Sequence, residues 1–131
     1  MAEDNVEVVR AMIEAFNARD RDTVLALADP DVEFRSAVED RVYRGHAGLV
    51  QYRDDVETLW EGWRIEDNRF IDAGGDRVVH LYCVVGQGIG SGVAVTRAFA
   101  TLWQLRDGKL LKGEVYLDPQ QALADAGVSE G

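Results

Sequence analysis

The sequence predicts a single α+β domain in which helices pack on one face of a strongly bent antiparallel sheet. Helical periodicity fills most of the first half of the chain, whereas alternating strand patterns fill residues 64–118. This grouping of helices before strands is typical of the α+β class. The chain has 131 residues, the length of one ordinary domain, and no repeat or linker divides it. We therefore expect one domain over residues 1–131.

Two helices are expected at the start of the chain. The first covers residues 3–20, where apolar side chains recur at three- and four-residue spacing, as on a helix that buries one stripe. These side chains are Val9, Met12, Ile13 and Phe16. A shorter helix is expected within residues 21–30 and must end before Pro30, because the proline ring cannot continue a helix.

A short strand and a third helix come next. Residues 31–36 alternate, with Val32 and Phe34 on one side and charged residues on the other, which predicts a half-buried strand. Residues 45–63 return to helical spacing. The apolar stripe of this helix consists of Leu49, Tyr52, Val56, Leu59, Trp60 and Trp63.

The second half of the chain is expected to form a meander of strands. These strands cover residues 64–73, 77–85, 93–105 and 110–118. Asp107-Gly108 lies between two alternating runs and is a strong hairpin signal. The last segment, residues 118–127, is expected to close the chain as a short helix that ends at Gly127. A pocket would remain wherever the helices do not fill the hollow of the sheet.

Composition and charge exclude several classes of function. The chain has 24 acidic and 14 basic residues and a net charge of −10, so it repels nucleic-acid backbones and anionic lipid headgroups. No apolar run approaches the ~18 residues that a membrane span requires, and the acidic start lacks a signal-peptide pattern. The single Cys83 cannot form an intrachain disulfide. We expect a cytoplasmic protein with neither nucleic acid nor membrane as a partner.

Motifs for nucleotides, metals and covalent nucleophiles are not found. The segment GQGIGSG, residues 86–92, lacks the G-x-G-x-x-G spacing and joins two strands instead of opening a helix. His46 has no second ligand at metal spacing. The serines lack the G-x-S-x-G context of an activated nucleophile. We therefore expect no metal site and no cofactor.

His80 is the first candidate for acid–base chemistry. It shares a strand face with Tyr82 and Val84, because side chains on a strand repeat every two residues. If that face points into the hollow, the imidazole could act as a general base. The alternative is a half-buried histidine with a structural role.

The final strand has a polar face and an aliphatic face. The polar face carries Glu114, Tyr116 and Asp118. The aliphatic face carries Leu111, Val115 and Leu117. Two orientations remain open: either the polar side chains lie in solvent and the aliphatic ones meet the helices, or the polar side chains enter the hollow and the aliphatic ones meet a second subunit. In the second case a carboxylate beside Trp60 and Trp103 would lose hydration, which favours general acid–base chemistry.

Several local segments match a known family in order and spacing. They are VRAMIEAFNARD, LALADPDVEF, YRGHAGLVQYRDD, FIDAGGDRVV, FATLWQLRDGKL and EVYLDPQQALADAG, and they cover nearly the whole chain. In these segments the chain resembles SnoaL-like proteins of the nuclear transport factor 2 (NTF2-like) superfamily. The resemblance implies a cone-shaped fold: three N-terminal helices pack on a strongly curved, mixed but mostly antiparallel sheet that encloses a pocket. It also implies a homodimer through the outer sheet face, which favours polar side chains of the final strand in the pocket.

The superfamily includes ketosteroid isomerases, whose site would need a Tyr on the first helix and two Asp residues in the sheet. The matching positions here hold Met12, Ser36, and Ala100 or Thr101, so all three roles are lost. Limonene-type epoxide hydrolases need an Asp two residues after an Arg. Here Arg97 is followed by Phe99, which can neither accept nor donate a proton.

Polyketide cyclases of the SnoaL type use an acidic base late in the sheet with a His nearby. Glu114 or Asp118 together with His80 is the nearest equivalent, although Thr101 stands where many relatives carry a His. The same resemblance covers non-catalytic binding and assembly modules, so the fold implies a cavity without fixing a chemistry.

The sequence thus predicts a pocket protein for a hydrophobic small molecule, acting as a cofactor-free isomerase, cyclase or dehydratase. The alternative is a non-catalytic ligand-binding or dimeric interaction module. The acid–base candidates are Asp118, Glu114 and His80. The expected ligand-binding side chains are Tyr116, Arg97, Tyr52, Trp60, Trp103, Phe16, Met12, Phe99 and Tyr82. For Arg97, an ion pair with Glu114 across the strands is a second interpretation.

Overall fold

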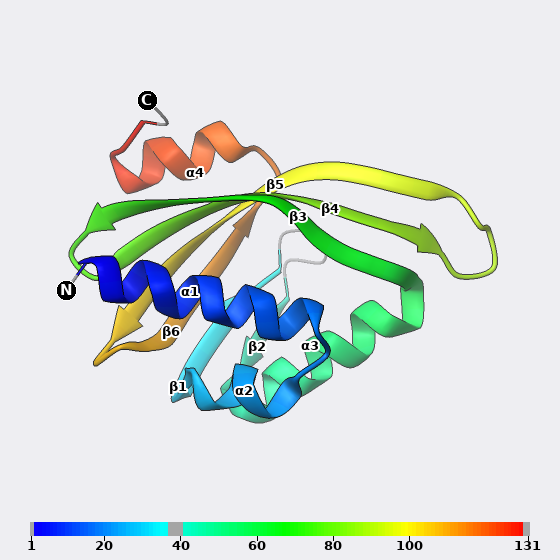
Figure 1. Ribbon diagram of the computed structural model, residues 1–131, viewed down its shortest axis with the longest axis horizontal. Coiled ribbons are helices and arrows are strands. Elements are labelled where there is room, and N and C mark those ends of the chain that lie inside the picture. The colour runs from blue at the N-terminus through cyan, green and yellow to red at the C-terminus, as the bar shows by residue number, and fades with distance from the viewer. Residues whose placement is uncertain (1, 37–40, 130–131) are drawn as a thin grey trace.

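One curved sheet with helices on both of its faces forms the protein, as a computed structural model of residues 2–36 and 41–129 shows (Figure 1). The elements, in chain order, are α1 (Ala2–Asn17), α2 (Arg21–Ala26), β1 (Ala28–Arg35), β2 (Val42–Arg44), α3 (Gly45–Leu59), β3 (Trp60–Gly74), β4 (Arg77–Gly88), β5 (Ala94–Arg106), β6 (Lys109–Tyr116) and α4 (Pro119–Ala126). The predicted α+β class is therefore confirmed.

The sheet is mixed but mostly antiparallel, as predicted. Its strand order is β2-β1-β6-β5-β4-β3. Only the pairing of β1 with β6 is parallel among the pairs between these strands. The hairpin of β4 and β5 extends well beyond the helices at one end of the sheet (Figure 1).

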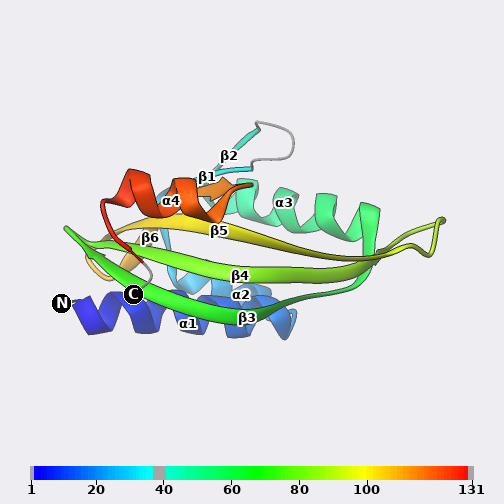
Figure 2. The same ribbon diagram turned by 90° about the horizontal axis from the view of Figure 1, so that it is seen from above.

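Two apolar cores lie on opposite faces of the sheet. Figure 2 shows α1 and α4 on opposite sides of the long strands β3, β4 and β5. We call the face under α1 the inner face and the face under α4 the outer face. On β4, Val78 belongs to the inner core, whereas the neighbouring Val79 and Leu81 belong to the outer core with Leu123 of α4. Strand alternation thus assigns each side chain to one core.

The three N-terminal helices all contribute to the inner core, in agreement with the sequence. Val9 and Met12 of α1 are buried there, and Val24 of α2 and Tyr52 of α3 pack against them. Asn17 fixes the end of α1 to β3: its Nδ2 donates to the Ile65 carbonyl at 2.9 Å, and the Ile65 N–H donates to its Oδ1 at 2.9 Å. The entry of β3 is therefore held under α1.

Gly113 makes room for an aromatic contact of the inner core. It is the register partner of both Phe34 on β1 and Trp103 on β5. Because Gly113 has no side chain, the Trp103 indole lies over β6 and stacks on Phe34, with ring centroids 5.6 Å apart. A Cβ at position 113 would lie 2.6 Å from Cζ3 of Trp103, closer than real Cβ atoms approach.

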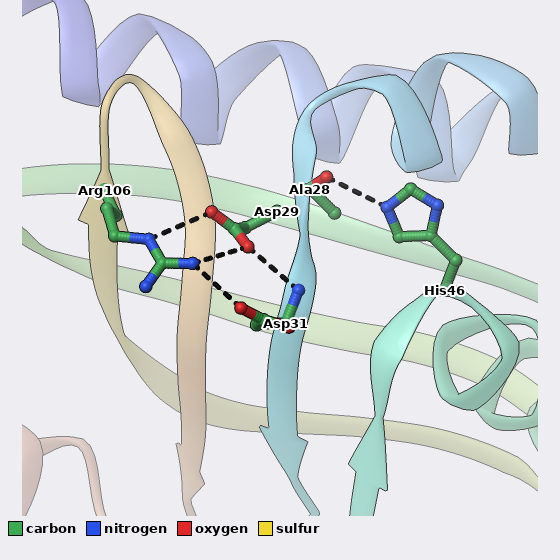
Figure 3. A network of polar contacts seen from close by, with 5 residues as sticks. All are labelled: Ala28, Asp29, Asp31, His46 and Arg106. Atoms are coloured by element: carbon green, nitrogen blue, oxygen red, sulfur yellow. Dashed lines mark hydrogen bonds and ion pairs between the residues drawn. The ribbon is translucent and has the colours of Figure 1, made fainter.

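An ion-pair network connects the start of β1 to the end of β5 (Figure 3). Arg106 donates to both carboxylate oxygens of Asp29, at 3.1 and 2.9 Å, and to Asp31 at 3.1 Å. The Asp31 N–H also donates to Asp29 at 2.8 Å. These contacts lower the pKa of Asp29, and the hydrogen bond from the Asp31 N–H has the largest effect. They satisfy a carboxylate that would otherwise be costly to bury, so the network holds the strands together.

The structure differs from the sequence-based expectation at several element boundaries and by one additional strand. The third helix ends at Leu59 instead of residue 63, because Trp60 already pairs with Gly88 of β4 and Gly62 adopts a left-handed φ of 62°. The first strand begins at Ala28, three residues earlier than expected. The three-residue strand β2 was missed, since so short an edge strand has no detectable alternation.

We expect Gly113→Ala to lower the free energy of unfolding by about 1–3 kcal/mol, because the added methyl group would push the Trp103 indole away from Phe34. Urea unfolding measures the difference. Lys112→Ala, an exposed change on the same strand, should stay within about 0.5 kcal/mol of the parent protein. Equal stability of the parent and Gly113→Ala would contradict the described position of the indole.

Candidate functional site

Polar and aromatic side chains gather on the inner face where β4 and β5 pair. We call them the inner-face cluster: Tyr52, Phe70, His80, Tyr82, Phe99, Thr101 and Trp103. In the register of β4 and β5, His80 pairs with Thr101 and Tyr82 pairs with Phe99. The long hairpin thus places three of the predicted ligand-binding aromatics, Tyr82, Phe99 and Trp103, on one face.

His80 is buried and fixed in one orientation. Its Nε2 lies 2.7 Å from Oδ1 of Asn68, whose Nδ2 donates to the Ile65 carbonyl. This arrangement assigns the proton to Nε2 and leaves a lone pair on Nδ1. The imidazole lies between the rings of Phe70 and Tyr82, at centroid distances of 4.8 and 4.4 Å.

Burial lowers the pKa of His80 to about 3. The imidazole is therefore neutral at pH 7, and a base with so low a pKa accepts a proton poorly from a weakly acidic substrate. A neutral imidazole still offers a hydrogen-bond acceptor at Nδ1. His80 thus faces the inner core, with the protonation properties of a hydrogen-bonding group.

A β-bulge brings Asn68 to His80. The pairing of β3 with β4 shifts register between Glu66 and Arg69, and Asp67 adopts a positive φ of 55°. Bulges of this kind redirect side chains and are frequent beside functional sites. Asn68 is a site residue that the sequence analysis missed. Its signal was the pair Asp67-Asn68 inside a predicted strand, because both residue types are unfavourable there.

Two tyrosines supply hydroxyl groups to the cluster. The Tyr82 hydroxyl lies 2.8 Å from Oγ1 of Thr101. Burial raises the pKa of Tyr82 to about 12 and also raises the pKa of Tyr52, with the nearby Tyr82 adding to the second effect. Both hydroxyls therefore stay protonated at neutral pH and can donate hydrogen bonds. The Tyr52 ring meets Phe34 edge-on, with centroids 4.7 Å apart.

Trp103 carries a buried donor without a partner. The residue is 4% exposed, and its Nε1 finds no acceptor among the described residues. An unsatisfied buried donor costs about 1–3 kcal/mol. The sequence analysis identified the ring of Trp103 as a ligand contact but not this property of its N–H group.

Of the two orientations left open for the final strand, the one that the resemblance favoured is wrong. Val115 packs against the inner core, whereas Tyr116 packs in the outer core under α4. Strand alternation then places Glu114 on the outer side as well, where it is exposed. The polar side chains therefore do not enter the inner face, and the aliphatic Val115 is not available as a subunit surface.

Helix α4 explains this orientation. Asp118 is its N-cap and accepts a hydrogen bond from the Gln120 N–H at 2.9 Å. The Tyr116 hydroxyl donates to Asp125 of α4 at 2.9 Å. Burial, this hydrogen bond and nearby carboxylates raise the pKa of Tyr116. Asp118 and Tyr116 thus connect the sheet to the last helix.

The remaining predicted ligand contacts lie in different places. Arg97 is exposed, with its guanidinium 5.4 Å from the Phe99 ring centroid. Its register partner is Val84, whereas Glu114 pairs with Leu102, so the alternative of an Arg97–Glu114 ion pair is wrong.

Besides Arg97 and Tyr116, three further predicted contacts lie outside the cluster. Met12 is 6% exposed in the core, and Phe16 contacts Trp63 with ring centroids 4.7 Å apart. Trp60 is half-buried at the start of β3 and does not lie on the stripe of α3.

Neither a metal-binding group nor a membrane-spanning helix is found in the described part of the chain. In residues 2–36 and 41–129, His, Cys, Asp and Glu side chains form no group of three that could hold a metal ion. None of the helices in this part of the chain has the length and apolarity that a membrane span needs.

Comparison with known proteins decides the family. The model of the SnoaL-like domain matches residues 9–112. The chain belongs to the SnoaL-like family. The resemblance predicted from the sequence is thereby confirmed. No curated protein matches this SnoaL-like chain at a significant level.

Solved structures similar to this SnoaL-like protein share its fold along almost the whole chain. An NTF2-like protein of unknown function from Burkholderia pseudomallei K96243 is 25% identical, with a TM-score of 0.79, over 92% of this chain and 95% of its own. TerC, co-crystallized with polyporic acid, is 29% identical, with a TM-score of 0.79, over 94% and 97%. A proposed polyketide cyclase from Xanthomonas campestris pv. campestris is 22% identical, with a TM-score of 0.80, over 95% and 98%, which shows the fold alone.

We expect this SnoaL-like protein to lose about 2 kcal/mol of stability between pH 7.5 and pH 5 through His80. The folded-state pKa of about 3 lies below the ordinary value of 6.5, so the unfolded chain binds the proton first as the pH falls. The contribution of His80 to the free energy of unfolding is therefore fully present above pH 6.5 and is lost as the pH falls toward 3.

Urea unfolding at several pH values tests this expectation. His80→Gln should flatten the pH dependence between pH 7.5 and pH 5, whereas His46→Gln, which changes the only other histidine, should retain it. A steep dependence that persists in His80→Gln would show that other groups cause it.

Proposed function

We propose that this SnoaL-like protein binds a hydrophobic, aromatic small molecule at the inner-face cluster. The observation that carries the proposal is the combination, on one sheet face, of several aromatic rings with neutral hydrogen-bonding groups. Tyr52, Tyr82 and Phe99 are only half-buried by the protein itself. An apolar surface with a few directed polar groups is the usual composition of a small-molecule site.

The relatives support the same class of ligand. TerC, which is 29% identical over 94% of this chain, was co-crystallized with polyporic acid. The site proposed here would hold such an aromatic acid by ring contacts with Phe70, Tyr82 and Phe99. The hydroxyls of Tyr82 and Thr101 would then meet its oxygen atoms.

Binding is favoured over acid–base turnover by the positions of the ionisable groups. Glu114 is exposed on the outer side and Asp118 caps α4, so neither carboxylate reaches the inner-face cluster. The cluster itself contains no carboxylate, and His80 is a weak base. A general base matched to neutral pH is thus missing from the described part of this face.

A second candidate function is cofactor-free proton transfer, such as isomerisation, cyclisation or dehydration. The positions of three side chains favour this function. His80 lies opposite Thr101 in the register of β4 and β5, so its imidazole lies beside the hydrogen-bonded hydroxyls of Tyr82 and Thr101. The hydroxyl pair would stabilise an enolate oxygen, and Nδ1 of His80 would exchange the proton. The homodimer and the cytoplasmic location remain predictions.

Polyporic acid is the first ligand to test, with tryptophan fluorescence as the readout. Tyr82→Phe and Thr101→Val should each weaken binding about three- to tenfold, because each removes one hydroxyl group of the pair. Glu114→Gln on the outer side should bind as the parent protein does. Equal weakening by all three variants, or a complete lack of binding to the parent, would contradict the proposed site.

A proton-transfer role is tested separately. The substrate is an aromatic ketone with an exchangeable α-proton, such as 2-methyl-1-tetralone. In D₂O, ¹H NMR should show faster loss of this proton with the parent protein than with His80→Gln. Exchange at the same rate in both proteins would remove His80 from the chemistry and leave binding as the function.

A further inference from the structure

We infer that the indole N–H of Trp103 selects ligands that carry an acceptor oxygen on an aromatic ring system. The ligand class is therefore an aromatic carbonyl compound, such as an aryl ketone or a quinone. This inference rests on the proposed function, because it assigns the group that orients a ligand at the inner-face cluster.

Trp103 differs from the other polar groups of this face because its donor is both buried and unpaired among the described residues. His80 is paired with Asn68, and the Tyr82 hydroxyl is paired with Thr101. The Trp103 N–H is buried and has no partner among the described residues. A phenylalanine would make a similar stack with Phe34 without burying a donor. The N–H group thus adds a cost of about 1–3 kcal/mol that an acceptor on a bound ligand would remove.

The geometry of the ring excludes the nearest backbone as the missing partner. The atoms Cε3, Cζ3 and Cη2 of the indole lie over Gly113, each within 2.8 Å of where a Cβ would be. In an indole these atoms belong to the six-membered ring, and Cε3 lies on the side opposite Nε1. The six-membered ring, and not the N–H edge, therefore lies over Gly113, and Nε1 has no backbone partner among the described residues.

The surroundings also disfavour an ordered water as the permanent partner. Trp103 pairs with Val78 across the strands, and Leu105 and Leu110 belong to the same buried cluster. A buried water is stable when it has about three polar partners. These aliphatic side chains offer none, the hydroxyl of Thr101 is already paired with Tyr82, and Tyr52, which packs against the same cluster, offers one hydroxyl only. An acceptor that arrives with its own apolar ring fits this environment better.

The test compares two ligands that differ in one carbonyl group, 1-tetralone and tetralin. Removing the N–H with Trp103→Phe should lower the ratio of tetralone to tetralin affinity about five- to tenfold, because only tetralone loses a hydrogen bond. Tetralin affinity should change little. Tyr116→Phe removes a donor from the outer face and should leave the ratio unchanged. Isothermal titration calorimetry measures the six affinities, of two ligands for three proteins.

The parent protein gives a second readout that does not depend on the folding of a variant. In ¹H–¹⁵N spectra, tetralone should move the indole resonance of Trp103 downfield and slow its exchange with solvent, whereas tetralin should not slow the exchange. The chain has three tryptophans, so assignment of this resonance is simple.

Two failures are distinguishable. If both ligands bind but Trp103→Phe leaves their ratio unchanged, or tetralone does not affect the Trp103 resonance, the inference is overturned and the proposed function stands. If neither ligand binds the parent protein, the proposed function fails and the inference fails with it.

Discussion

The pairing register of β4 with β5 is the constraint on which the rest of the structure depends. It sets Val78 opposite Trp103 and His80 opposite Thr101, and alternation then fixes which side chains meet α1 and which meet α4. A shift by one residue would exchange the two faces, exposing His80 to α4 and Leu81 to α1. Each face has its own apolar core, so both cores oppose such a shift.

This division between faces also separates structural from chemical roles. The outer face uses its polar groups to attach α4, through the Asp118 cap and the hydrogen bond from Tyr116 to Asp125. The inner-face cluster itself holds neutral polar groups among aromatic rings. Burial lowers the pKa of His80 and raises the pKa of Tyr82, so both side chains stay neutral. A face of this kind suits an uncharged or weakly acidic aromatic ligand better than a cation.

Much of the fold could be predicted from the sequence, because its signals are local. The helical stripe of Met12 and Phe16, the hairpin at Asp107-Gly108 and the stop at Gly127 each depend on a few neighbouring residues. The aromatic side of the site followed from alternation once the strands were placed. Which face of the last strand meets the inner core could not be predicted. Both of its faces are covered, one by α1 and the other by α4. Asn68 was missed because a bulge breaks the alternation on which the prediction relied.

The most direct test of this account is a methyl–aromatic NOE experiment on Val115, Tyr116 and Leu123. The assigned register and the two cores predict NOEs between the Tyr116 ring and the Leu123 methyl groups, and between the Val115 methyl groups and aromatic protons of the inner core. NOEs from Val115 to Leu123, together with contacts of the Tyr116 ring to Phe34 or Trp103, would show that the faces are reversed and would contradict the account.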